Sequence, residues 1–96
     1  MITEHQKKIV LEYLSPLRPF KVGIFGSYAR GENKEDSDLD ILIHLSYPNQ
    51  ISLLNLVRVE QDLSEALGIH IDLVTEKSMS PHVRPFIEKD LHYILE

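Results

Sequence analysis

Hydrophobic and polar positions alternate along this 96-residue chain in stretches of helical and of strand period. Apolar residues at helical spacing predict a helix over residues 3–14 and a longer one over 52–67, with Gly68 as its C-cap. Short apolar runs between turn residues predict strands at 21–25, 39–45 and 69–74. The order of these helices and strands indicates an α/β domain.

Turn and cap residues suggest how the remaining segments fold. A short helix or turn is expected at 28–31, and Tyr47-Pro48-Asn49 closes the second strand. Ser80 and Pro81 predict the N-cap and first position of a helix that runs to about residue 90. Residues 91–95 fit either a terminal strand or a helical tail. Because no Pro/Gly/Ser-rich linker or repeat divides the chain, we expect a single domain over residues 1–96.

The two longer predicted helices each have an apolar face. In the first helix the inward positions are Ile2, Ile9, Val10, Tyr13 and Leu14. In the second helix one stripe is formed by Leu53, Leu56, Leu63 and Leu67. Further apolar residues, at positions 51, 54, 57 and 59, widen this stripe. The wide apolar arc fits either a surface for another chain or packing against the first helix.

A Gly-Ser pair follows the apolar run at 22–25, where the chain must change direction. Gly26 lets a ligand approach the backbone closely, and the free amides at the start of a following helix favour anions such as triphosphate oxygens. Ser27 can add a hydroxyl donor. An ordinary turn with an N-cap is the alternative reading of the pair alone.

Two aspartates, Asp38 and Asp40, precede and begin the next predicted strand. Residues i and i+2 of a strand point to the same face, so both carboxylates project side by side, and the apolar Leu39, Ile41 and Ile43 fill the other face. Adjacent carboxylates repel each other unless a cation lies between them. Carboxylates that share a site with substrate phosphates are typical ligands of magnesium (Mg2+). A solvated acidic loop is the alternative.

A third carboxylate, Asp72, lies in the strand predicted at 69–74, on the face opposite Ile71 and Leu73. Aspartate is a poor strand former, so a special role for it is plausible on physical grounds. If this strand lies beside the one that contains Asp40, the three carboxylates form a cluster able to hold two metal ions. Local capping or pairing of Asp72 is the alternative.

The segment GSYARGENKEDSDLD at residues 26–40 resembles the nucleotidyltransferase signature of the DNA polymerase beta superfamily, specifically that of the minimal nucleotidyltransferase (MNT) proteins. The segment IDLV at 71–74 is similar to the third-carboxylate strand of that family. The resemblance implies a small mixed β-sheet flanked by helices. It implies that Gly26 and Ser27 position the triphosphate, that Asp38 and Asp40 bind magnesium, and that Asp72 is the catalytic carboxylate. The family pattern assigns no role to Arg30, which we add as a candidate phosphate contact.

The resemblance also implies a function. MNT proteins are encoded beside a toxin with a HEPN domain, and the MNT protein acts as the antitoxin by transferring AMP from ATP to a tyrosine of the toxin, which is a ribonuclease. We therefore expect an adenylyltransferase that works in a hetero-oligomer, with the partner chain supplying the acceptor. Two alternatives stay open: an antitoxin that neutralises its partner by binding alone, and a nucleotidyltransferase that modifies a small molecule.

The charge of the chain favours a protein partner over a nucleic acid. Ten basic and 15 acidic residues give a net charge of −5, so the basic surface of a nucleic-acid binder is not expected. The chain has no cysteine, which excludes disulfides and thiolate zinc sites. An amphipathic start without an unbroken apolar core argues against a secretory signal, so a cytoplasmic location without membrane association is expected. Of the histidines, His44 and His70 share the aspartate face and are expected to be packed or hydrogen-bonded rather than metal ligands.

Overall fold

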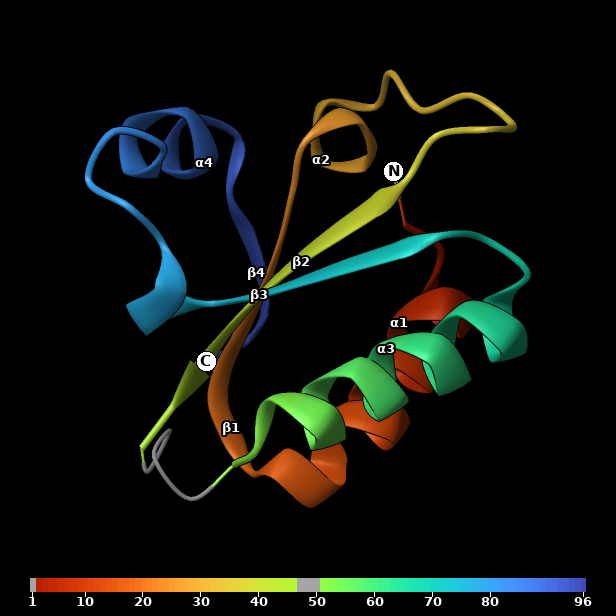
Figure 1. Ribbon diagram of the computed structural model, residues 1–96. Helices are drawn as coiled ribbons and strands as arrows, with labels where there is room; N and C mark the ends of the chain where they lie inside the picture. Colours follow the sequence, from red (N-terminus) through yellow and green to blue (C-terminus); the bar gives the residue numbers. More distant parts are fainter. Residues whose placement is uncertain (1, 47–50) are drawn as a thin grey trace.

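The computed structural model describes residues 2–46 and 51–96, so the predicted Tyr47-Pro48-Asn49 turn lies outside the described residues (Figure 1). The chain forms, in order, α1 (Glu4–Leu14), the short 3-10 helix η1 (Ser15–Leu17), β1 (Pro19–Phe25), α2 (Ser27–Arg30), β2 (Leu39–Leu45), α3 (Leu53–Leu67), β3 (Ile71–Thr75), the 3-10 helix η3 (Glu76–Ser78), α4 (Arg84–Asp90) and β4 (His92–Leu95). The predicted α/β class is confirmed, and the tail at 91–95 is a strand rather than a helix.

The four strands form one mixed sheet in the order β3-β2-β1-β4. β1 pairs antiparallel with both β2 and β4, whereas β2 pairs parallel with β3. A parallel pair needs a crossover connection, and α3 provides it between β2 and β3. The small mixed sheet expected from the family resemblance is therefore present.

One face of the sheet is closed by α1 and α3, which lie side by side (Figure 1). Alternation along β2 directs Leu39, Ile41 and Ile43 into this layer, where all three side chains are fully buried. They pack with Val10 and Leu14 of α1. Other buried members of this core are Val22, Ile24, Tyr28, Ala29, Leu63 and Ile71. This layer contains most of the buried apolar surface and therefore most of the hydrophobic stabilisation.

The opposite face is covered only in part, by α4 and the segment before it (Figure 1). A second, smaller cluster joins Leu42 of β2 to Met79 and Ile87. Phe25, Val74 and Leu91 pack against it while remaining partly exposed. Leu42 points to the same face as Asp40, so this cluster lies next to the carboxylates and leaves them at its edge.

The caps of the first two long helices follow the sequence. Thr3 caps α1 through a capping box with Gln6, and the Ser52 hydroxyl accepts a hydrogen bond from the Asn55 amide at 3.1 Å. Gly68 ends α3 in the left-handed conformation, as predicted. Strand ends differ by two residues from the predicted bounds, because β1 begins at Pro19 and β3 at Ile71.

The predicted start of the last helix is wrong. α4 begins at Arg84, and Ser80 instead forms a turn whose hydroxyl accepts from the Val83 amide at 3.3 Å. Pro85 explains the difference: it lies in the first turn of α4, where the missing N–H of proline is not needed. Had the helix begun at Pro81, Pro85 would lie in its second turn and break a backbone hydrogen bond.

Two residues are exposed, one predicted to face inward and one assigned to the apolar stripe of the second helix. Tyr13 is 38% exposed, and Leu53, in the first turn of α3, is 76% exposed. The side of α3 that packs on the core contains Leu56, Val59, Leu63 and Leu67, so packing against α1 accounts for part of the wide apolar arc. The rest of that arc is solvent-exposed in this chain and includes Leu54, which is 74% exposed.

Candidate active site

The parallel pairing of β2 with β3 brings two of the three predicted carboxylates together. Asp40 and Asp72 are register partners, so their side chains stand next to each other on the same face of the sheet. Asp38 lies one residue before β2 and points to the same side. Its Oδ1 is 3.2 Å from Nδ1 of His70, at an exposed position. The strand of Asp72 therefore lies beside the strand of Asp40, as the predicted carboxylate cluster requires.

The electrostatic environment of Asp40 is unusual. The pKa of its carboxyl is raised to about 6, chiefly by burial and in addition by the neighbouring charges of Asp72 and Asp38. Arg30 and His70 act against this rise. A cation placed among these carboxylates would relieve their mutual repulsion and restore the ionised form of Asp40.

The carboxylates suit a metal ion that also binds substrate. All their donor atoms are oxygen, which is the ligand set that magnesium prefers. Within residues 2–46 and 51–96, however, no group of three acidic or histidine side chains is close enough to hold a metal by itself. Magnesium often takes only one or two carboxylates and completes its shell with water and substrate phosphates. The residues therefore fit magnesium bound together with a polyphosphate.

The Gly26–Ser27 turn lies directly against Asp40. Gly26 is the N-cap residue of α2, with φ 75° and ψ −152°, a backbone conformation almost restricted to glycine. A Cβ at this position would collide with Oδ2 of Asp40. The buried side chains of Tyr28 and Ala29 anchor the turn, and Ser27 is half-buried at the start of α2. The turn predicted to cradle phosphates thus adjoins the carboxylates.

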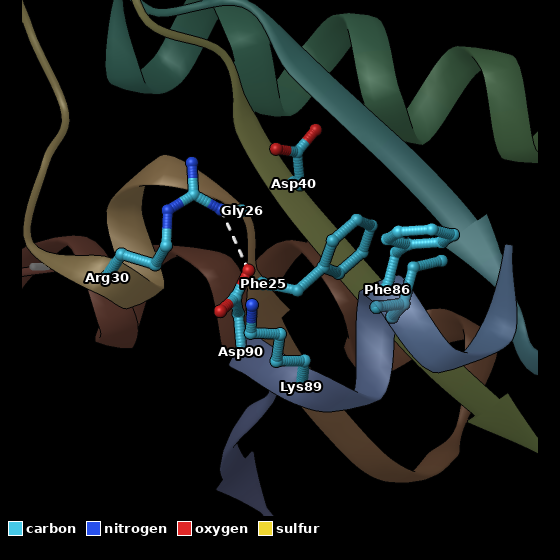
Figure 2. A pocket seen from close by; sticks show the side chains of 8 residues that line it. Phe25, Gly26, Arg30, Asp40, Phe86, Lys89 and Asp90 are labelled. Atoms are coloured by element: carbon cyan, nitrogen blue, oxygen red, sulfur yellow. Dashed lines mark hydrogen bonds and ion pairs between the residues drawn. The ribbon is translucent and has the colours of Figure 1, made fainter.

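A cavity of about 460 Å³ lies between the Gly26 turn, the start of β2 and α4 (Figure 2). Its lining residues are Phe25, Gly26, Arg30, Asp40, Phe86, Ile87, Lys89 and Asp90. A second cavity, of about 300 Å³, shares Phe25 and Ile87 with the first and reaches Asp72. Asp40 therefore borders the first cavity and Asp72 the second.

Arg30, predicted as a phosphate contact, lines the larger cavity but is already paired. Its Nη1 donates to Oδ2 of Asp90 at 2.8 Å (Figure 2). Its Nε donates to Oε2 of Glu32 at 3.1 Å. The bond to Asp90 connects α2 to the end of α4 across the cavity. A contact between Arg30 and a nucleotide stays a prediction.

Phe86, Lys89 and Asp90 of α4 are lining residues that sequence reasoning did not single out. Their spacing of three and four residues places them on one side of a helix. This helical spacing can be recognised in the sequence. It identifies these residues as cavity-lining only when the position of α4 over the aspartate face is known. The expectation for His44 is confirmed: its Nε2 lies 3.1 Å from the Tyr93 hydroxyl, and burial lowers its pKa.

Comparison with known proteins identifies the family. The model of the nucleotidyltransferase domain family matches residues 4–94. The chain is 45% identical to MJ1217 of Methanocaldococcus jannaschii, described as a candidate protein adenylyltransferase, over 98% of this chain and 91% of that protein. It is 38% identical to the protein adenylyltransferase MntA of Thermococcus cleftensis, over 77% of this chain and 73% of that protein. In the described parts of the chain, no helix has the length and apolar character to span a membrane.

Solved structures agree with this assignment. The chain matches a candidate minimal nucleotidyltransferase with a TM-score of 0.76 and 32% identity, over 92% of this chain and 88% of that one. It shares the fold of the MNT antitoxin in a complex with a tri-AMPylated HEPN toxin of Shewanella oneidensis, with a TM-score of 0.75 and 19% identity, over 96% and 71% of the two chains. The same fold occurs in a toxin–antitoxin crystal structure with AMP-PNP, with a TM-score of 0.79 and 22% identity, over 91% and 70%. With the acidic strand pair and the Gly-Ser turn in place, the chain belongs to the nucleotidyltransferase domain family and has the polymerase beta-like fold of the minimal nucleotidyltransferases.

Proposed function

We propose that this chain is a protein adenylyltransferase that acts as the antitoxin of a HEPN toxin. The observation that carries the proposal is the register of Asp40 with Asp72 beside the Gly26 turn, at the edge of a cavity large enough for part of a nucleotide. The relatives described as protein adenylyltransferases, and the fold shared with an antitoxin bound to an AMPylated toxin, support the choice of acceptor.

The proposed reaction follows from the positions of the side chains. ATP would bind with its phosphates against the Gly26–Ser27 turn, and Asp38 and Asp40 are the residues that would hold magnesium there. Magnesium, when bound, neutralises phosphate charge and polarises the α-phosphoryl group. Asp72 is exposed, so an incoming tyrosine hydroxyl of the toxin can reach it and pass its proton to it. The tyrosine oxygen then bonds to the α-phosphorus while the bond to the β-phosphate oxygen breaks, and pyrophosphate leaves.

The chain is well suited to an acceptor on another protein. The carboxylates lie at an open edge of the sheet, with Asp38 and Asp72 both exposed, so a partner can approach them directly. The exposed Leu53 and Leu54 of α3 and the net charge of −5 offer further contacts for such a partner. We infer a hetero-oligomer in which the HEPN toxin covers the open edge and supplies the tyrosine.

The test is transfer of AMP to the partner. The native chain, Asp38→Asn and Asp36→Asn are each incubated with magnesium, α-labelled ATP and the HEPN protein encoded beside it, and the partner is analysed by intact mass and autoradiography. Asp36 is a matched control because it is an exposed acid in the same loop, outside the carboxylate cluster. The proposal predicts a mass gain in steps of AMP with the native and Asp36→Asn chains, and none with Asp38→Asn.

Other outcomes separate the alternatives. A stable complex without label on the partner would show neutralisation by binding alone. Transfer to a small alcohol in the absence of any protein partner would favour a small-molecule nucleotidyltransferase. Mapping the modified peptide by fragmentation then shows whether the acceptor is tyrosine.

A further inference from the structure

The side of α4 that faces the larger cavity has a composition suited to a nucleotide. Phe86 and Lys89 are three residues apart and both line this cavity, while Ile87 packs against the sheet and fixes the helix in place. The same cavity contains Gly26 and Asp40, at the centre of the proposed reaction (Figure 2). Whatever binds at Asp40 with its phosphates therefore has α4 as a wall.

Lys89 is the cation at this cavity whose charge is not balanced. The guanidinium of Arg30 is held between Asp90 and Glu32, so its charge is compensated by two carboxylates. For Lys89, in contrast, the described part of the chain contains no hydrogen bond or ion pair. An unpaired ammonium group that lines the same cavity as Asp40 is well placed to contact the phosphates of a ligand bound there.

Phe86 exposes an unusually large apolar surface. Its side chain is 74% exposed, although it borders a cavity with Phe25 on its inner side (Figure 2). Phe20, another exposed phenylalanine, packs its ring against His44 with 5.7 Å between centroids, whereas among the described residues Phe86 has no aromatic neighbour in ring contact. A nucleobase stacked on Phe86 would cover this surface.

From these observations we propose that α4 forms the nucleotide-binding wall of the site, with Phe86 as the stacking surface for the base and Lys89 as a contact for the triphosphate. The inference rests on the proposed function in that it takes the ligand to be a nucleoside triphosphate. Because stacking on a phenyl ring tolerates every base, Phe86 contributes affinity and positioning rather than selection of adenine. Lys89, in contrast, acts on the phosphates whatever base is attached.

The two roles are separable by two ligands. Binding of α,β-methylene-ATP, which retains base and phosphates but cannot release pyrophosphate, is measured by calorimetry with magnesium, in parallel with inorganic tripolyphosphate. We expect Phe86→Ala to weaken binding of the nucleotide about tenfold, within the range of a lost base–aromatic stack, and to change binding of tripolyphosphate less than about twofold. We expect Lys89→Gln to weaken both ligands about tenfold, as for loss of a charged hydrogen bond.

Matched controls lie away from the cavity. Phe20→Ala removes an exposed ring at the other end of the sheet, and Lys8→Gln removes an exposed charge on α1; both should bind the two ligands as the native chain does. Phe86→Tyr keeps an aromatic surface and should restore nucleotide affinity to within about twofold of native. Because both tested side chains are exposed, circular dichroism should show native folding in every variant.

The proposal is overturned if Phe86→Ala and Lys89→Gln bind both ligands like the native chain, while Asp40→Asn does not. That result would leave the proposed nucleotidyl transfer intact. It is likewise overturned if Phe86→Ala weakens only the complex with the HEPN partner, since Phe86 would then be a protein contact. Failure of the native chain itself to bind the nucleotide would overturn the proposed function and this inference together.

Discussion

The two faces of the sheet differ in composition and burial: one is a continuous apolar core, and the other combines a small apolar cluster with carboxylates. Toward α1 and α3, β2 presents Leu39, Ile41 and Ile43, all fully buried within a continuous apolar core. Toward the other side, the same strand presents Leu42, which is buried beneath the short α4, and Asp40, which is only partly covered. Alternation along one strand thus assigns packing to one face and charge to the other.

The difference shows how a chain of 96 residues accommodates a strained acidic site. Burial of Asp40 and repulsion from Asp72 and Asp38 disfavour its ionised carboxylate, raise its pKa to about 6 and lower the stability of the folded chain. The core on the opposite face supplies the compensating hydrophobic energy and contains none of the three carboxylates. Stability and chemistry should therefore respond to different substitutions.

Removal of magnesium should have the largest effect, and only on the acidic face. Chelation with EDTA should reduce AMP transfer to the HEPN partner at least about 1000-fold, because a metal supplies several kcal/mol of charge stabilisation in the transition state. Readdition of magnesium should restore transfer. Circular dichroism should show a folded chain both before and after chelation, with only a small fall in melting temperature from the loss of the bound cation. Transfer at the native rate in EDTA would exclude a metal-dependent site.

Shortening a side chain on the apolar face should lower stability and leave AMP transfer nearly unchanged. Ile41→Ala should lower the free energy of unfolding by about 2–5 kcal/mol, since it opens a cavity in a fully buried position. Ile41→Val, the matched variant, should cost about 0.5–1.5 kcal/mol. Urea titration gives both values. Per folded molecule, AMP transfer should change less than about twofold, and a large specific loss of transfer would show that the two faces are coupled.

Gly26→Ala tests the point where the Gly-Ser turn meets the acidic face. The substitution should cost about 1–3 kcal/mol of stability because alanine is strained at this φ and ψ, and its Cβ would push Asp40 aside. Gly31→Ala is the control: its φ is also positive, at 71°, but a Cβ there meets open space, so about 1 kcal/mol is expected. Nucleotide affinity should fall for Gly26→Ala and stay native for Gly31→Ala; equal affinity in both would contradict a role for the turn.

The pH dependence should show the smallest effect. The pKa of Asp40 is raised from 3.8 to about 6 on folding, so the folded state disfavours the ionised carboxylate. The native chain without metal should therefore lose stability as pH rises from about 4 to 7, by on the order of 1–2 kcal/mol after allowance for solvent screening. Denaturation in EDTA across this range, with Asp40→Asn as reference, should show this component only in the native chain. A parallel dependence in both chains would refute the assignment to Asp40.

The sequence predicts the acidic strand pair well because its signals are local. The period of two along β2 and the Asp38–Asp40 spacing determine the face of each side chain, and the register with Asp72 follows once the strands adjoin. The start of α4 is predicted wrongly because Ser80 and Pro81 resemble a helix cap, whereas Pro85, four residues after Pro81, decides where the helix begins. The exposure of Leu53 depends on which residues of α3 pack on the core, and no local pattern encodes this.

The cavity wall depends still more on tertiary structure. Phe86 and Lys89 carry no motif, and their meaning comes from the position of α4 over the aspartate face. The ion pair of Arg30 with Asp90 joins residues 60 apart in the chain. The motif at residues 26–40 therefore cannot predict that this arginine is paired with Asp90.

The most direct test of the separation between the two faces is Asp40→Asn, measured for both properties in one preparation. We predict no detectable AMP on the HEPN partner by intact mass, together with a free energy of unfolding at pH 7 equal to or above that of the native chain, because a repelling charge has been removed. Transfer at the native rate by this variant would contradict the account.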